Sequence, residues 1–439
     1  MIEMETQLKK RYGLLTAIAM VVGIVIGSGV FFKAPKVLAN TGGSMVKSLL
    51  TVGIVGLIMI ICSYVFSILA TRYEKVNGIV DYSEVALGKK YAYYVGWFLA
   101  TLYYPALTAC LAWVSAQYAC ILFGLPVAGS AHVAIGTFFL VGSYVLNALS
   151  PRLAGKFQVS ATIIKLIPLV LMAVVGTIAG LINGLTIEAL TTADAGLAQT
   201  GGGIMGAIVA FAFAYEGWII ATSINAELKD SKKNLPKALV IGAFIVVLVY
   251  LGYFLGLTGS LSVADIAAAG DDLPRQAFTS LFGNVAGTLV FVIIVISCLG
   301  TTNGLMLGCC RGLYCLSVRG MGPAPKIFSQ VDPETNMPVN SSIFGLLMCG
   351  IHFLYWQVCF FETRVLGTVS LPLLLSWEPD ELPIITLYAA YIPIFLMMMK
   401  KEKGLPAFKR FVVPALALCG CVFMILAAVF SHGFAVVRY

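Results

Sequence analysis

The sequence predicts an all-α protein that crosses a membrane about eleven times and is built from two inverted repeats of five helices. Three observations support this fold class. The chain of 439 residues is 60% hydrophobic and only 11% charged, which lies outside the range of soluble domains. Its apolar residues are collected into eleven long runs. Two of these runs, the first and the sixth, are interrupted near their centres by glycine.

Each run is long enough to cross a hydrocarbon core of about 30 Å as one helix. In chain order the runs are 14–39, 48–70, 93–123, 133–149, 157–182, 204–226, 239–258, 285–318, 342–361, 383–399 and 411–430. The polar gaps between them are too short for a soluble domain, so residues 1–439 are expected to form one membrane domain. The first run is too long for a cleavable signal and is expected to remain as a span.

Basic residues test this number of spans, because cytoplasmic loops of membrane proteins collect Lys and Arg. With a cytoplasmic N-terminus, the loops on that side hold 21 of the 28 basic residues, and the opposite loops hold six. The sequence therefore predicts a multi-pass protein of the plasma or cytoplasmic membrane with its N-terminus in the cytoplasm. The net charge of +8 reflects this topology and does not indicate a nucleic-acid partner.

The first span is broken by Gly27-Ser28-Gly29. A helix that unwinds at two glycines exposes N–H and C=O groups that lipid cannot satisfy. A zwitterionic solute can satisfy both kinds of group, with its carboxylate on N–H groups and its ammonium on carbonyls. The alternative is helix packing, because Gly23 and Gly27 also form a pair of small residues four apart. The outer half-helix is expected over residues 31–37.

The sixth span is broken by Glu216 and Gly217. Because the two breaks lie five spans apart, the broken spans run in opposite directions, as inverted repeats require. The sequence thus predicts repeats at 1–183 (helices 1 to 5) and 203–400 (helices 6 to 10), with a peripheral eleventh helix at 411–430. Two matched breaks favour a solute site, and transport, over packing alone.

Glu216 is an acid at mid-bilayer depth, where a charge costs several kcal/mol unless it is paired or protonated. Three interpretations stay open. The carboxylate can hydrogen-bond the broken backbone beside it, contact a cationic substrate side chain, or carry a proton.

Lys165 lies well inside the fifth span, where it can snorkel to the cytoplasmic surface. Alternatively, its buried ammonium can hydrogen-bond the unwound carbonyls of the first span and hydroxyls of the eighth span. Ser297, Gly300 and Thr301 share one face of that eighth span. In this position a fixed positive charge would act as a bound sodium ion does.

Aromatic residues flank the second break. Phe213 is interpreted as an outer gate, although packing is the ordinary role of an aromatic residue in an apolar helix. Tyr103, Tyr104 and Pro105 of the third span are candidate pocket walls, with packing equally consistent.

Other function classes fit less well. The eleven cysteines and three histidines do not show metal-site spacing, so no metal and no cofactor is expected. A membrane enzyme is disfavoured because no His-Glu-x-x-His motif is present. A pore is disfavoured because the polar residues cluster at the two breaks and do not line a continuous path.

Together these motifs resemble the amino acid-polyamine-organocation transporter superfamily over nearly the whole chain. The Phe-Ala-Tyr-x-Gly-Trp form at 213–218 is most similar to its sodium-independent, L-type-like amino acid exchangers. The other matching segments are Gly23-x-x-Ile26-Gly27-Ser28-Gly29-Val30-Phe31, the loop 227–236, Gln158-x-x-x-Thr162-x-x-Lys165, and Asn303-Gly304 with Arg311.

The resemblance implies a LeuT-type fold that works by alternating access. It implies that N–H groups of Ser28 and Gly29 bind the substrate carboxylate, and that carbonyls near Val25, Phe213 and Glu216 bind its ammonium. Lys165 matches the lysine that replaces sodium. The expected substrate-binding residues are Val25, Gly27, Ser28, Gly29, Phe213, Glu216, Gly217 and Trp218, with Phe213 as gate and Lys165, Ser297 and Thr301 for coupling.

One departure concerns the side chain of the substrate. Many relatives have a small or neutral residue where Glu216 stands, whereas some that take cationic amino acids have an acid there. The proton-sensing glutamate of an arginine/agmatine exchanger would align near Ile219, so the resemblance does not support that proton mechanism.

The expected function is sodium-independent transport of L-amino acids, by exchange or with a proton as the coupled partner, and with a preference for cationic or polar side chains. The alternative is an amino acid sensor that uses the same pocket without net transport. The oligomeric state stays open.

Overall fold

The computed structural model describes residues 9–27, 29–73, 77–127, 129–192, 202–365 and 381–432. Within these residues, eleven helical segments are long and apolar enough to cross a membrane, which confirms the predicted number. Besides the broken first and sixth spans, they are α3 (Met45–Arg72), α5–η1–α6 (Lys89–Leu122), α7 (Ser130–Leu149), α8–η2–α9 (Pro151–Ile182), α12 (Ser231–Leu257), α15 (Asn284–Ser317), α17 (Val339–Val365), α18 (Glu381–Lys401) and η7–α19 (Phe408–His432).

Shorter helices connect the spans. They are α4 (Gly78–Leu87), α10 (Leu185–Thr191), α13 (Val263–Ala268), η5 (Gly270–Asp272), α14 (Leu273–Phe282) and α16 (Pro325–Phe328). Within the described residues no strand forms, and an isolated β-bridge joins Tyr12 to Leu228. The boundaries of the two repeats stay predictions.

The first span is discontinuous, as predicted. Helix α1 (Leu14–Val25) ends where Ile26 leaves helical geometry, and α2 begins at Gly29 and ends at Asn40. The outer half-helix is longer than the predicted 31–37. The prediction ended it near Pro35, but Pro35 removes only one backbone donor and does not end α2. Ser28 lies outside the described residues.

The sixth span is discontinuous as well. Helix α11 (Gly203–Ala212) tightens into a 3₁₀ turn, η3 (Phe213–Tyr215), and a second 3₁₀ segment, η4 (Trp218–Glu227), follows the break. Between them Glu216 is extended and Gly217 has φ +98°. A Cβ on Gly217 would also lie 2.6 Å from Cγ2 of Ile24, so both backbone and space require glycine here.

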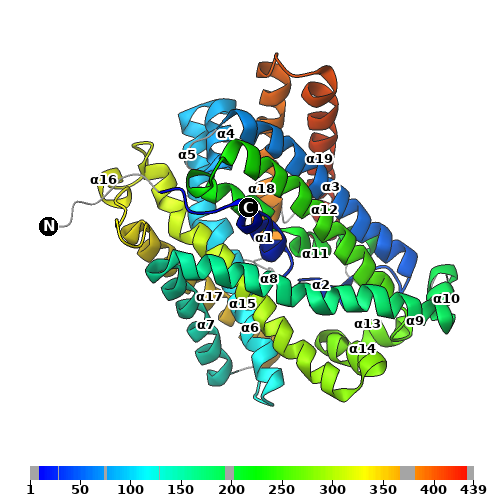
Figure 1. Cartoon of the computed structure of the whole chain (residues 1–439). Helices are drawn as coiled ribbons and strands as arrows, with labels where there is room; N and C mark the ends of the chain where they lie inside the picture. Colours follow the sequence, from blue (N-terminus) through cyan, green and yellow to red (C-terminus); the bar gives the residue numbers. More distant parts are fainter. Residues whose placement is uncertain are drawn as a thin grey trace.

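The two broken spans cross at the centre of the molecule. Figure 1 shows α1 near the middle of the view, and α1 packs on α8, α12, α15 and η4. A Cβ on Gly29 would lie 2.8 Å from Cα of Ala214, so the two breaks touch backbone to backbone. Helix α19 lies at the edge, beside α3, α11 and α18, which agrees with its predicted peripheral place.

Glycine packing, the alternative explanation of the first motif, is also present. A Cβ on Gly23 would lie 2.0 Å from Oγ1 of Thr162, so Gly23 allows α1 and α8 to approach closely. A Cβ on Gly27 would lie 3.1 Å from Oγ1 of Thr301, a tight but less demanding contact. Packing therefore explains Gly23, whereas the break begins beyond it.

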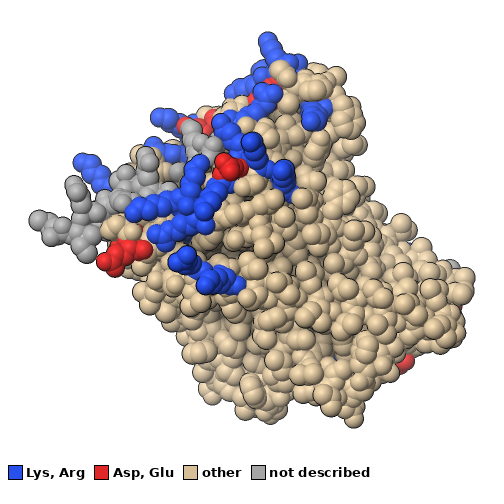
Figure 2. All heavy atoms as spheres, in the orientation of Figure 1, with Lys and Arg blue, Asp and Glu red and all other residues tan. Residues whose placement is uncertain are grey.

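Lys and Arg side chains gather on one part of the surface in Figure 2. We call this end of the molecule the basic side; it carries residues 9–12 and the starts of α8 and α12. The backbone N–H groups of Arg11 and Tyr12 donate to the Glu227 carbonyl at 2.7 and 3.0 Å. Burial, with a smaller contribution from the Glu227 carboxylate, raises the pKa of the Tyr12 hydroxyl, which keeps it protonated.

A buried ion pair closes the same end. Nε of Arg311 donates to Oε1 of Glu227 at 2.7 Å, and Asn336 donates to the other carboxylate oxygen at 3.2 Å. Both charged side chains are at most 1% exposed. The N-terminal segment, the end of η4 and the end of α15 are thus tied together at Glu227, the first through its backbone carbonyl and the last through its carboxylate.

Candidate functional site

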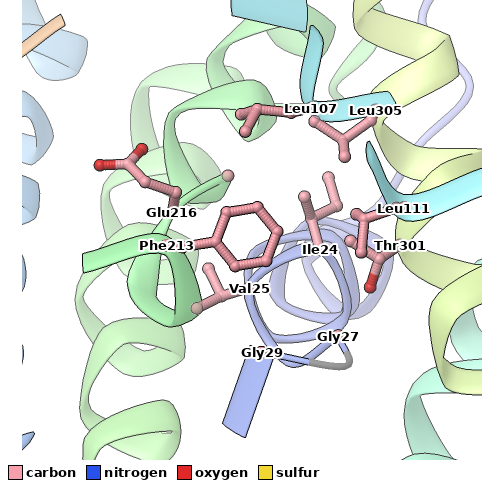
Figure 3. Close-up of a pocket in the computed structure, with 11 residues that line it drawn as sticks. Ile24, Val25, Gly27, Gly29, Leu107, Leu111, Phe213, Glu216, Thr301 and Leu305 are labelled. Carbon is pink, nitrogen blue, oxygen red and sulfur yellow. The ribbon is translucent and has the colours of Figure 1, made fainter. Parts of the chain in front are cut away.

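A small cavity lies between the two breaks. It is lined by six of the predicted substrate-binding residues, Val25, Gly27, Gly29, Phe213, Glu216 and Gly217, and by Ile24, Leu107, Leu111, Thr301 and Leu305. Its volume is about 20 Å³, which is room for about one water molecule. Figure 3 shows the Phe213 ring among the lining side chains, between Glu216 and Ile24. An amino acid therefore needs this ring or a neighbouring helix to move before it fits.

The carbonyls at the first break are satisfied by a lysine. Nζ of Lys165, which is fully buried on α8, lies 2.7 Å from the Gly23 carbonyl and 2.6 Å from the Ile26 carbonyl. It also lies 3.0 Å from the Ser297 carbonyl and 3.1 Å from Oγ1 of Thr301. Lys165 does not snorkel but joins the broken span to α15.

The contact with Ser297 differs from the predicted one. The expectation was a hydroxyl partner for Lys165, yet the ammonium meets the Ser297 backbone carbonyl. The Ser297 hydroxyl instead donates to the Gly27 carbonyl at 3.3 Å. The Ser297 hydroxyl is therefore directed to the broken span, and the hydroxyl that Lys165 meets is that of Thr301, one turn further along α15. The coupling role of the three residues stays a prediction.

Tyr250 of α12 links the two breaks. Its hydroxyl lies 3.0 Å from the Val25 carbonyl and 2.9 Å from the Ala214 carbonyl, one on each broken span. The Val25 carbonyl also accepts from the Gly27 N–H at 2.8 Å. The Tyr250 hydroxyl has one proton, which the Val25 and Ala214 carbonyls share, so the protein supplies the Val25 carbonyl with one full donor and one shared donor. Sequence reasoning missed Tyr250 because a tyrosine inside an apolar span gives no signal of its partner.

We expect Tyr250→Phe to lower both the thermal unfolding midpoint and the uptake rate, since the change leaves two buried carbonyls without this donor. The loss should be about 1–2 kcal/mol of unfolding free energy. Tyr253→Phe is the matched control, because that hydroxyl on the same helix has no hydrogen-bond partner among the described residues. Equal effects of the two substitutions would contradict a link through Tyr250.

Glu216 faces three tyrosines, Tyr103, Tyr388 and Tyr391. Its Oε2 accepts from the Tyr103 hydroxyl at 2.7 Å, and the residue is 5% exposed. In Figure 3 the carboxylate points away from the other lining residues. Tyr103, Tyr104 and Pro105 were predicted as pocket walls, but none of them lines the cavity; Tyr103 reaches the site only through this hydrogen bond.

The position of Tyr103 follows from Pro105. Because Pro105 has no N–H, it cannot bond the Thr101 carbonyl one turn earlier, and the span forms a π-helical turn, η1 (Leu99–Tyr103). Nε2 of His352 on α17 lies 2.8 Å from that freed carbonyl. The distorted turn ends at the tyrosine that contacts Glu216.

Trp218 is placed differently from the other predicted site residues. It does not line the cavity but packs edge-on against Phe66, with ring centroids 5.5 Å apart, and lies 6.1 Å from the ring of Tyr391. The chain turns at Gly217, so the residue after it points away from the first span.

An amide cluster separates the cavity from the basic side. Nδ2 of Asn147 donates to Oδ1 of Asn303 at 2.9 Å, and Nδ2 of Asn303 donates to Oε1 of Gln158 at 3.2 Å. The space beside this cluster is about 10 Å³ and reaches Tyr12. The central cavity is thus closed toward the basic side by polar side chains and by the docked N-terminal segment.

The fold and the site define a class: an all-α, multi-pass membrane protein of the LeuT type with a candidate solute site between two broken spans. The solved structure of MhsT in complex with L-phenylalanine has the same fold. The TM-score is 0.64, and the match covers 96% of this chain and 99% of that chain. At 14% identity this likeness concerns the fold alone.

The chain belongs to the amino acid permease family, whose model matches residues 12–438. It is 29% identical to the serine/threonine exchanger SteT of Bacillus subtilis (strain 168), over 95% of this chain and 91% of that protein. It is 26% identical to the b(0,+)-type amino acid transporter 1 of Mus musculus, over 98% of this chain and 90% of that protein. It is 24% identical to the human cystine/glutamate transporter, over 98% of this chain and 82% of that protein.

These relatives are transporters and exchangers of amino acids. They place the chain among amino acid transport proteins of the amino acid-polyamine-organocation superfamily, as the sequence motifs predicted.

Proposed function

We propose that the chain carries L-amino acids across the cytoplasmic membrane by alternating access, without sodium, as an exchanger or with a coupled proton. The observation that carries this proposal is the Lys165 ammonium. It holds the Gly23 and Ile26 carbonyls at the first break and contacts the Ser297 carbonyl of α15. A fixed cation at the point where these elements meet makes a bound metal cation unnecessary there. On this proposal the N-terminus and the basic side face the cytoplasm.

The proposed substrate backbone lies between the breaks, with its carboxylate on N–H groups of Ser28 and Gly29. The ammonium would bind carbonyls of the second break, at Phe213 and Glu216. The Val25 carbonyl takes part most readily when the single Tyr250 proton is donated to the Ala214 carbonyl, which leaves Val25 with the Gly27 N–H alone. Phe213 is the proposed gate, since its ring lies among the residues that line the cavity (Figure 3).

Glu216 is the proposed reader of substrate charge. Its carboxylate is buried, and its Oε1 makes no hydrogen bond of full geometry among the described residues, although Tyr388 and the Gly217 N–H lie close enough to interact with the carboxylate. A buried acceptor of this kind is stabilised by a cationic substrate group. This supports a preference for cationic or polar side chains. The SteT, b(0,+)-type and cystine/glutamate relatives show that one family accommodates several side-chain chemistries.

Counterflow in proteoliposomes tests the transport proposal. Vesicles loaded with an unlabelled amino acid should accumulate the labelled one in sodium-free buffer, and a panel of cationic, polar and apolar amino acids should rank the substrates. A requirement for sodium would contradict the proposed role of Lys165. Binding of a labelled amino acid without any counterflow would instead favour the sensor alternative.

A further inference from the structure

A second and much larger cavity lies at the basic side, outside the candidate substrate site. Its volume is about 810 Å³, and it runs between the N-terminal segment and the first turns of α8. Five of its ten lining residues are basic, and no described acidic residue lines it. We call this cavity the basic groove, defined by Lys10, Arg11, Arg152, Lys156 and Lys229.

Topology alone does not explain this convergence. The preference of cytoplasmic loops for Lys and Arg accounts for basic residues on one side, but it does not direct them into one cavity. The basic groove draws its cations from three separate segments, around residues 10, 152 and 229. Among the described residues, Arg152, Lys156 and Lys229 have no ion-pair partner. Cations that line one cavity create a positive potential that attracts an anion.

The basic groove opens onto a membrane-facing surface. Along α8, Lys156 and Ser160 are exposed, and the same helical face continues through Ile163 and Ile167, which are 60% and 51% exposed. Leu15, at the start of α1, is 71% exposed. The candidate spans begin near this level, so the groove lies where the apolar surface ends.

We propose that the basic groove binds the phosphate-bearing head group of an anionic phospholipid, with the acyl chains along the exposed apolar face of α8. A free phosphate ion would use the cations but not the adjoining apolar face. A lipid uses both, and basic pockets between transmembrane helices are suited to anionic head groups. The proposal therefore commits to a lipid of the membrane that surrounds the protein.

The bound head group would contact the segment that closes the basic side. Arg11 and Tyr12 line the basic groove, and their N–H groups donate to the Glu227 carbonyl. A lipid held by Arg11 on this segment and by Arg152 on α8 stabilises the docked position of the N-terminal segment. The basic groove thus makes closure at this side sensitive to the charge of the surrounding lipid.

Native mass spectrometry of the purified full chain in detergent tests this inference. The probes are short-chain phosphatidylglycerol, phosphatidylcholine with the same acyl chains, and inorganic phosphate. We expect the wild-type chain to retain phosphatidylglycerol in preference to phosphatidylcholine. The Arg152→Gln/Lys156→Gln double variant should bind it roughly 30-fold more weakly, the effect of removing two cations at about 1 kcal/mol each.

The matched control is Lys89→Gln/Lys90→Gln, which removes the same charge from exposed residues that lie outside the basic groove. It should bind phosphatidylglycerol as the wild type does. Equal retention of the two lipids by the wild type, or equal losses in the two double variants, would overturn the proposal. Full displacement of phosphatidylglycerol by an equal concentration of inorganic phosphate would show a free-anion site and would overturn the lipid assignment. The comparison of the two lipids on the wild-type chain decides the matter even if a variant fails to fold.

Discussion

Replacement of Lys165 by alanine is expected to abolish most transport while leaving the folded protein able to bind its amino acid. The substitution leaves the Gly23, Ile26 and Ser297 carbonyls without their shared ammonium donor. Each buried carbonyl that loses its partner costs about 1–3 kcal/mol. Because the ammonium contacts the protein and not the cavity between the breaks, the cost falls on the conformational change more than on the contacts to the solute.

Counterflow rates and binding should be measured on the same preparation. We expect the turnover of Lys165→Ala to fall at least about tenfold, the equivalent of about 1.4 kcal/mol, with a much smaller change in affinity. Lys165→Arg should not restore it, because the site is narrow: a Cβ on Gly300 would lie 3.5 Å from Nζ. Lys237→Ala removes an exposed cation from α12 and serves as the control. Weakened binding with normal turnover would rule out the scaffold role of Lys165.

Glu216→Gln is expected to change which amino acids are carried. The amide keeps an oxygen for the Tyr103 hydroxyl but removes the negative charge. Uptake of lysine or arginine relative to alanine should then fall by about tenfold, since a hydrogen bond to a charged group contributes about 1.5–3 kcal/mol. An unchanged ratio would show that Glu216 does not read substrate charge.

Two further measurements separate the roles of this carboxylate. Tyr103→Phe removes the hydroxyl but keeps the charge, so it should affect cationic and neutral substrates alike. If Glu216 carries a proton instead, Glu216→Gln should abolish accumulation driven by a pH gradient and leave exchange intact. If Glu216 instead reads substrate charge, Glu216→Gln should change the ratio of cationic to neutral substrates both in accumulation driven by a pH gradient and in exchange.

The sequence predicts the fold well because membrane insertion imposes strong local rules. Apolar length located all eleven spans, and glycine with a polar neighbour located both breaks. The sequence left Lys165 with two interpretations, and the structure confirms the buried ammonium over snorkelling, with the Ser297 carbonyl in place of the expected Ser297 hydroxyl.

The remaining parts depend on contacts between distant segments. Tyr250 is one of many aromatic residues in apolar spans, and only the packed structure shows that its hydroxyl meets two carbonyls. Trp218 was expected beside the substrate because it follows the break. The positive φ of Gly217 turns it toward Phe66 instead. The direction in which a side chain points after a helix break depends on the backbone torsion angles at the break, which residue type alone does not specify.

The backbone contact between Gly29 and Ala214 has a consequence for leakage. A carrier that opened both ends at once would let its solute run down any gradient without exchange. The outer half of the first span begins against the second break, and a side chain on Gly217 would collide with Ile24 on the inner half. The same small region of the sixth span therefore meets both halves of the first. If the chain works by the proposed alternating access, opening both ends at once would require both contacts to separate together, and these glycine contacts would oppose uncoupled flux.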